Sequence, residues 1–167
     1  METLQQVFEA SLCNVFYAEK QTAKLLPKMI KKAASEELAD AFRRHVEQVQ
    51  RKIDRLEKVF DLIGRPAKAK KSDALQCAVQ EAESQTKDTK NGALRDAIMI
   101  AGAQALEQYK VSHYQTLSDW AQRLGFSGAT RLLVQTLHED RETDERLSAV
   151  KAKVLLDSQE SGHRKTA

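Results

Sequence analysis

The sequence predicts an all-α protein, a four-helix bundle with one long crossover that carries a short fifth helix. Three observations support this fold class. The chain of 167 residues has only six Gly and two Pro, and it is long enough for one domain built from four long helices. Its dominant residues, Ala, Leu, Glu, Lys, Gln and Arg, are strong helix formers. Apolar residues recur three and four positions apart in four long segments.

The first two long helices fill the N-terminal third of the chain. The first is expected from about Thr3 to Lys32, with an apolar side formed by Leu4, Phe8, Leu12, Val15, Leu26 and Met29. Ser35 is a suitable N-cap for the second helix. The apolar side of this second helix is formed by Phe42, Val46, Val49, Ile53, Leu56, Phe60 and Ile63. Gly64 and Pro66 then end it.

The segment after Pro66 is too long for a hairpin between neighbouring helices. Ser72 could cap a short helix within it, and such a connection carries the chain from one end of a bundle to the other. The third long helix is expected from about Ala93 to Leu124. The fourth should span Ala129 to Asp157, with an inner side formed by Leu133, Leu137, Leu147, Val150 and Val154. We therefore expect a bundle domain over residues 1–157, followed by a frayed polar tail over residues 158–167.

Polar residues interrupt the apolar side of the long helices near their middles. The first helix carries Glu19, the third Glu107 and Lys110, and the fourth Asp140 and Asp144. In the second helix, three polar residues lie beside the apolar side: His45, Gln48 and Lys52. In an antiparallel bundle these groups can meet at one level. A charged group on an apolar face is costly unless something pairs with it.

Two kinds of buried centre are consistent with these residues. Carboxylates that converge from several helices can hold a di-iron or di-manganese centre, and His45 could add an imidazole ligand. Alternatively, Lys52 and Lys110 pair with the four acids in a salt-bridge layer that fixes the register of the helices. The residues alone leave both interpretations open.

Composition argues against several other classes of protein. The net charge is +3 with charges of both signs interspersed, so we expect no nucleic-acid partner, although short basic runs occur in RPAKAKK and GHRKTA. No secretory signal and no apolar run long enough for a membrane span are visible. Cys13 and Cys77 lie outside any metal or redox motif and are expected to be reduced, partly buried thiols of a cytoplasmic protein.

Four segments together resemble the small bacterial YciF-type stress-response proteins, a ferritin-like family. They are FYAEKQTAKLLPKM, LADAFRRHVEQVQRKIDRLEKVF, LEQYKVSHYQTL and LLVQTLHEDRETDERL, and the similarity runs from about Leu4 to Val154. The resemblance implies a homodimer of ferritin-like bundles, each with an extra short helix. It also implies similarity to rubrerythrin, whose bundle holds a di-iron centre, while the activity of the family itself is not established.

The resemblance also suggests which residues would bind a metal. Glu19, His45, Glu107 and Asp144 match residues of the same type in the family, and Asp140 takes the place of a glutamate. Three positions depart from the family, because Gln48 replaces a glutamate, Lys52 a glutamine and Lys110 a second glutamate. These changes remove two acids and add two cations. An ammonium about 4 Å from a divalent ion is repelled by several kcal/mol at moderate dielectric.

We therefore expect a stress-response or structural protein whose carboxylate centre is altered. This centre would be free of metal or would hold a single iron or manganese ion. The alternative is a di-iron or di-manganese oxidoreductase that consumes peroxide or oxygen.

Overall fold

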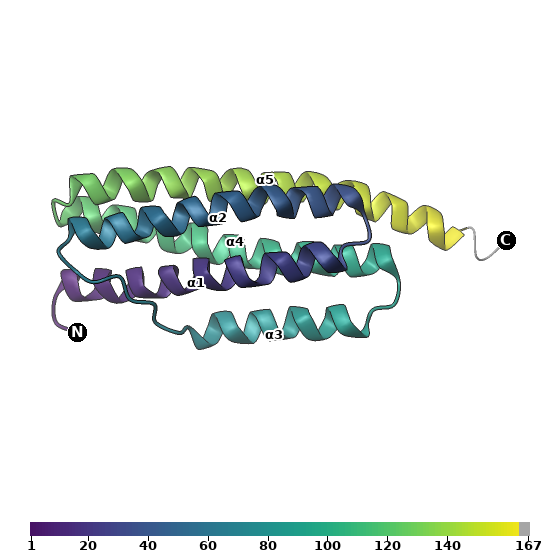
Figure 1. The fold of residues 1–167 in the computed structure, drawn as a ribbon, viewed down its shortest axis with the longest axis horizontal. Coiled ribbons are helices and arrows are strands. Elements are labelled where there is room, and N and C mark those ends of the chain that lie inside the picture. Colours follow the sequence, from purple (N-terminus) through teal and green to yellow (C-terminus); the bar gives the residue numbers. More distant parts are fainter. Residues whose placement is uncertain (164–167) are drawn as a thin grey trace.

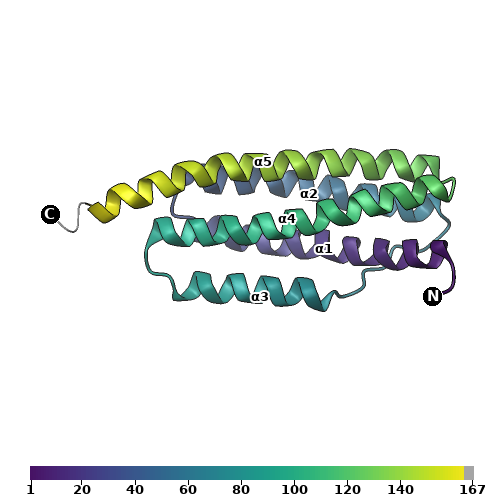
Figure 2. The same ribbon diagram turned by 180° about the vertical axis from the view of Figure 1, so that it is seen from behind.

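The computed structural model describes the backbone of residues 1–163 and the side chains of residues 1–156. This part of the chain forms five α-helices: α1 (Leu4–Lys32), α2 (Glu36–Leu62), α3 (Asp73–Asp88), α4 (Gly92–Arg123) and α5 (Ser127–His163). In Figures 1 and 2, α1, α2, α4 and α5 lie side by side as a bundle, and α3 runs along its outside. The predicted fold class, with its long crossover and short fifth helix, is confirmed.

Most helices that are neighbours in the sequence pack against each other. α1 packs mainly on α2, α4 packs mainly on α5, and α3 contacts α4. The single long crossover between the two helical pairs is the connectivity of ferritin-like bundles. No helix within the described residues is long and apolar enough to cross a membrane.

Local sequence explains where the helices begin and end. The hydroxyl groups of Thr3, Ser35 and Ser72 accept hydrogen bonds from backbone N–H groups in the first turns of α1, α2 and α3. α2 is followed by Gly64, with φ of 67°, and α4 by Gly125, with φ of 76°. At both glycines, the N–H of the next residue donates to a carbonyl group five positions earlier, which closes the helix end.

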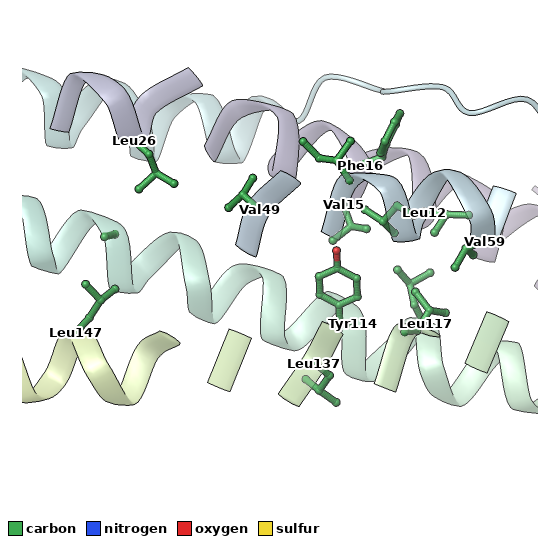
Figure 3. Close-up of a cluster of buried hydrophobic side chains, with 14 of the residues drawn as sticks. Leu12, Val15, Phe16, Leu26, Val49, Val59, Tyr114, Leu117, Leu137 and Leu147 are labelled. Atoms are coloured by element: carbon green, nitrogen blue, oxygen red, sulfur yellow. The ribbon is translucent and has the colours of Figure 1, made fainter. Parts of the chain in front are cut away.

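A core stripe with alternating steps of four and three residues runs along each bundle helix. In α1 it is formed by Phe8, Leu12, Val15, Glu19, Thr22 and Leu26, all of which are buried. Corresponding buried residues from the other helices, such as Val49, Leu117, Leu137 and Leu147, meet them in the bundle interior (Figure 3). Since each stripe follows one face of its helix, the four faces enclose a single core.

Two sequence expectations about this fold are wrong. Leu4, placed in the first stripe, is 38% exposed at the start of α1. Cys77 is exposed rather than partly buried, and like Cys13 it forms no disulfide. The last helix, α5, continues to His163, beyond the expected helix end at Asp157, while the division into a bundle domain over residues 1–157 and a polar tail over residues 158–167 stays a prediction. Adding a residue to an existing helix gains a hydrogen bond without a new nucleation cost. Residues 164–167 of that tail lie outside the described residues.

Asp96 in α4 forms hydrogen bonds with the turn between α1 and α2. Its carboxylate is buried and accepts hydrogen bonds of 2.8 Å from the backbone N–H groups of both Ala34 and Ser35. Next to it, Arg95 donates to the carbonyl oxygen of Lys32. These contacts satisfy backbone groups between two helices, where no helical partner is available.

Replacement of Asp96 by Ala should lower the free energy of unfolding by about 2 kcal/mol, because two N–H donors lose a charged acceptor. Urea unfolding followed by circular dichroism measures this loss. The matched control is Asp119→Ala, an exposed aspartate of the same helix, which should change the stability by less than about 0.5 kcal/mol. Equal effects of the two substitutions would contradict the role given to Asp96.

Candidate functional site

Charged side chains from all four bundle helices meet in the bundle interior. Nζ of Lys110 lies 2.8 Å from Oε1 of Glu107, 3.3 Å from Oε2 of Glu19 and 3.6 Å from Oδ1 of Asp140. Nζ of Lys52 contacts the same oxygen of Asp140. All five side chains are at most 1% exposed. We call these five residues, together with His45 and Tyr114, the ion-pair centre.

His45 and Tyr114 complete the ion-pair centre. The Tyr114 hydroxyl group donates a hydrogen bond of 3.0 Å to Oε1 of Glu19. His45 is buried, with Nε2 3.4 Å from Oε1 of Glu107. Burial, and then the positive charges of Lys110 and Lys52, hold the pKa of His45 well below its ordinary value. The imidazole is therefore neutral at physiological pH.

Asp144 and Gln48, both predicted for the site, lie at the edge of the ion-pair centre. Asp144 is half-buried and accepts hydrogen bonds from Gln104, at 3.2 Å, and from Gln108, at 2.6 Å, so it does not join the ion-pair centre. Thr143 takes the inward position instead and donates to Oε1 of Gln48. The expectation that Asp144 faces inward is wrong. Thr143 and Asp144 follow Asp140 by three and four residues, so both lie near the same face of α5. In the packed bundle it is Thr143 that points inward.

The ion-pair centre has more acids than bases. If Glu19, Glu107 and Asp140 are all ionised, their three negative charges exceed the two positive charges of the lysines by one. Burial raises the pKa of Glu107 to about 7, although the charge of Lys110 opposes this rise, and burial also raises the pKa of Glu19. A proton held by a glutamate can therefore bring the centre to neutrality near pH 7.

Lys110 remains charged within this centre. Burial alone lowers the pKa of Lys110, but the negative charges of Asp140, Glu107 and Glu19 outweigh burial and raise the pKa above its ordinary value. The amine that sequence reasoning placed on an apolar helix face is thus a permanent counter-ion to the acids around it.

The residues present do not fit a dinuclear metal centre. Nζ of Lys110 lies among the oxygens of Glu107, Glu19 and Asp140, which is where a bridging cation would bind. A metal ion beside it would meet like charge at short range. Among residues 1–156, no group of three or more His, Cys, Asp or Glu side chains is arranged to hold a metal ion. Metal binding by Glu19, His45, Glu107, Asp140 and Asp144 therefore stays a prediction.

One further ion pair was missed by sequence reasoning. Arg55 of α2 donates to both carboxylate oxygens of Glu139 in α5, at 2.8 and 3.1 Å, and to Oγ1 of Thr136 at 2.7 Å. Arg55 and Thr136 are buried. Arg55 lies three residues after Lys52, on the same side of α2, so a search for charges one turn from the stripe would have found it.

Comparison with known proteins identifies the family of this chain. Residues 3–159 match a family described as a domain of unknown function, DUF892. The chain belongs to the DUF892 family. It is 34% identical over 149 residues to protein YciF of Escherichia coli K12, and the match covers 89% of this chain and 90% of YciF. The resemblance to YciF-type proteins is confirmed.

Solved structures agree with this DUF892 assignment. The crystal structure of the E. coli stress protein YciF is similar with a TM-score of 0.87 and 31% identity, covering 93% of this chain and 98% of that one. YcfI from Rhodopseudomonas palustris has a TM-score of 0.86 and 31% identity, covering 88% and 94%. Protein XCC3681 from Xanthomonas campestris, at 14% identity and a TM-score of 0.76, shares the fold.

Replacement of Lys110 by Met should lower the free energy of unfolding by about 3–5 kcal/mol at pH 8, because it leaves buried carboxylates without their counter-ion. Chemical unfolding measures the change. Lys24→Met, at an exposed position of α1, is the control and should cost less than about 0.5 kcal/mol. A loss below about 1 kcal/mol for Lys110→Met would show that the ammonium is not needed to neutralise the acids.

Replacement of Glu107 by Gln should change how stability depends on pH. The pKa of Glu107 is about 7 in the folded protein against an ordinary 4.5, so between these values the folded state binds more protons than the unfolded state. This group therefore makes the wild type less stable as pH rises from 4.5 to 7. The stability of the wild type minus that of Glu107→Gln should fall by about 3 kcal/mol over this range.

The measurement is a series of urea unfolding curves for both proteins from pH 4.5 to 8. The buried neutral His45 acts in the opposite direction, because its lowered pKa makes stability rise with pH up to its ordinary value of 6.5. Since both proteins contain His45, this contribution largely cancels in the difference. A difference that stays constant with pH would contradict the raised pKa of Glu107.

Proposed function

We propose that this protein is a non-catalytic stress-response protein in which the ion-pair centre stabilises the bundle in place of a metal centre. The observation that carries this proposal is the position of Lys110, whose buried ammonium group lies among three carboxylates from α1, α4 and α5. The similarity to a protein described as the E. coli stress protein YciF supports the stress-response role. A cytoplasmic homodimer without a nucleic-acid partner completes the proposal.

The chemistry of the centre suits a protein that must persist under stress. A lysine ammonium is covalently attached to its helix, so a chelator cannot remove it and an oxidant cannot change its charge state. A metal centre, by contrast, links folding to metal supply and to the protonation of its ligands. The stability of this bundle would therefore be independent of iron or manganese supply.

A second candidate keeps one metal ion in the centre. Both ring nitrogens of His45, Oε2 of Glu107 and Oδ2 of Asp140 are buried and form no hydrogen bond within the part of the chain that the structure describes. A nitrogen and carboxylate oxygens are ligand types that iron and manganese accept, but these three side chains would have to move to hold one ion, because they form no metal-binding group within the described residues. With such an ion the protein could be an oxidoreductase that consumes peroxide or oxygen, and stoichiometric metal with peroxide turnover would favour this candidate.

The proposal predicts that protein purified without chelator or nickel contains no stoichiometric iron or manganese, and that chelator leaves its melting temperature unchanged.

The triple variant Gln48→Glu, Lys52→Gln, Lys110→Glu restores the acidic pattern implied by the resemblance and removes both ammonium groups. The variant should gain iron(II) and manganese(II) binding, because its centre has an excess of carboxylates and no lysine ammonium group to repel a metal ion. Elemental analysis measures the metal content of the variant, and thermal unfolding with added manganese measures whether the metal stabilises it.

The matched control makes the same changes of charge at exposed positions, as Gln50→Glu, Lys58→Gln and Lys24→Glu. It should stay free of stoichiometric metal. Stoichiometric iron or manganese in the wild type would overturn the main proposal in favour of the second candidate. A triple variant that folds but binds no more metal than the control would show that the lysines are not what keeps metal out.

A further inference from the structure

An apolar cavity of about 200 Å³ lies between α1, α3 and α4, outside the bundle core. Its lining is largely hydrophobic and includes Leu25, Met29, Leu75, Val79, Met99 and Leu106. The cavity is partly open at the surface, where Ala74 and Ala78 are exposed, and its volume exceeds the roughly 150 Å³ of an enclosed apolar cavity that binds benzene. The cavity is thus large enough for a hydrophobic ligand, and it is separate from the ion-pair centre.

The cavity exists because α3 is held against α4 by small residues. A Cβ atom added to Gly102 of α4 would lie only 2.9 Å from Cβ of Ala82 in α3, so the two helices are in close contact there. Towards the cavity, α3 presents Ala74, Ala78 and Ala82. Short side chains fix the distance between α3 and α4, but they do not reach across to fill the space beside α1.

One end of this space is polar. A second cavity of about 200 Å³ adjoins the first and shares Leu25, Leu75 and Val79 with it. We call the two adjoining cavities the groove. Its other lining residues include Gln21, Gln76 and Gln80. Oε1 of Gln76 is buried and forms no hydrogen bond to any other described residue. This carbonyl oxygen only accepts hydrogen bonds, so it needs a donor such as water and does not itself attract a carboxylate.

The rim of the groove has an excess of positive charge. Lys28 lines both cavities and lies 3.8 Å from Glu83 across the groove, in a pair whose side chains are 66% and 45% exposed. Such an exposed pair contributes little and can exchange partners. Lys32 also lines the apolar cavity, and its ammonium group forms no ion pair with any described side chain. Two lysines against one glutamate favour an anionic ligand.

We propose that this groove binds a single-chain amphiphile with a carboxylate headgroup, such as a medium-chain fatty acid. The hydrocarbon tail would occupy the apolar cavity between α3, α4 and α1, and the carboxylate would pair with Lys28 or Lys32 at the rim. The volume favours a single chain over a two-chain lipid. This site does not depend on the function proposed for the ion-pair centre.

The test is isothermal titration calorimetry of the full-length protein with decanoate, below the critical micelle concentration. Saturable binding of one molecule per chain is expected, with decyltrimethylammonium at least about tenfold weaker, because the tail is the same and the charge is reversed. Ala78→Phe should weaken decanoate binding at least about tenfold by filling the cavity. Ala105→Phe, which fills the same cavity from α4, gives an independent second reading if the first variant does not fold.

A matched pair of variants tests the headgroup. Lys32→Glu should weaken decanoate binding about tenfold, whereas Lys31→Glu, at an exposed position that does not line the cavity, should change it less than about twofold. No saturable decanoate binding, equal binding of the cationic amphiphile, or unchanged binding in folded cavity-filling variants would each overturn the proposal. A cavity-filling variant that instead changes the oligomeric state would identify the groove as an interface between copies, and would overturn it too.

Discussion

The structure depends on the requirement that the charges buried in the bundle interior cancel. Each charge removed from water costs several kcal/mol, and this cost is offset only where opposite charges and hydrogen bonds surround it. Lys110 meets carboxylates of α1, α4 and α5, and Lys52 of α2 reaches Asp140 in α5. Sliding any helix by one turn, 5.4 Å, would break these contacts, whereas apolar stripes that repeat every turn tolerate such a shift more easily. The ion-pair centre therefore specifies the register of the helices.

The same electrostatic balance can be reached with metal ions or with lysines. A dinuclear centre places two divalent cations among carboxylates. This protein instead places two ammonium groups among three carboxylates. Two lysines supply half the positive charge of two divalent ions, so fewer acids are needed for neutrality. Gln48 and Lys110, at positions where the resemblance implies acids, are consistent with this smaller requirement. Burial raises the pKa of Glu107 to about 7, and the proton that Glu107 can then hold would neutralise the one acid in excess.

The extent of the helices was predictable because caps and apolar repeats are local signals. Which polar residues enter the centre was only partly predictable, because steps of three and of four residues lie close together on a helix surface. Glu19, Glu107 and Asp140 were placed correctly, but Asp144 was not. His45 and Lys52, placed beside the stripe of α2, are fully part of its buried face. No local signal could pair Asp96 with a turn 62 residues away, because that contact depends on the packing of α4 against α1.

The position of α3 shows why a stable bundle can still contain unfilled space. The four long helices share one core, and α3 packs outside it, where Leu75 forms a separate small cluster with Ala18 and Leu106. α3 is attached to α4 through a close contact between Gly102 and Ala82, and larger side chains there would force the helices apart. The same small residues leave the apolar cavity beside α1 empty of protein atoms. This cavity is the space that the tail of the amphiphile proposed above would fill, with α3 forming one of its walls.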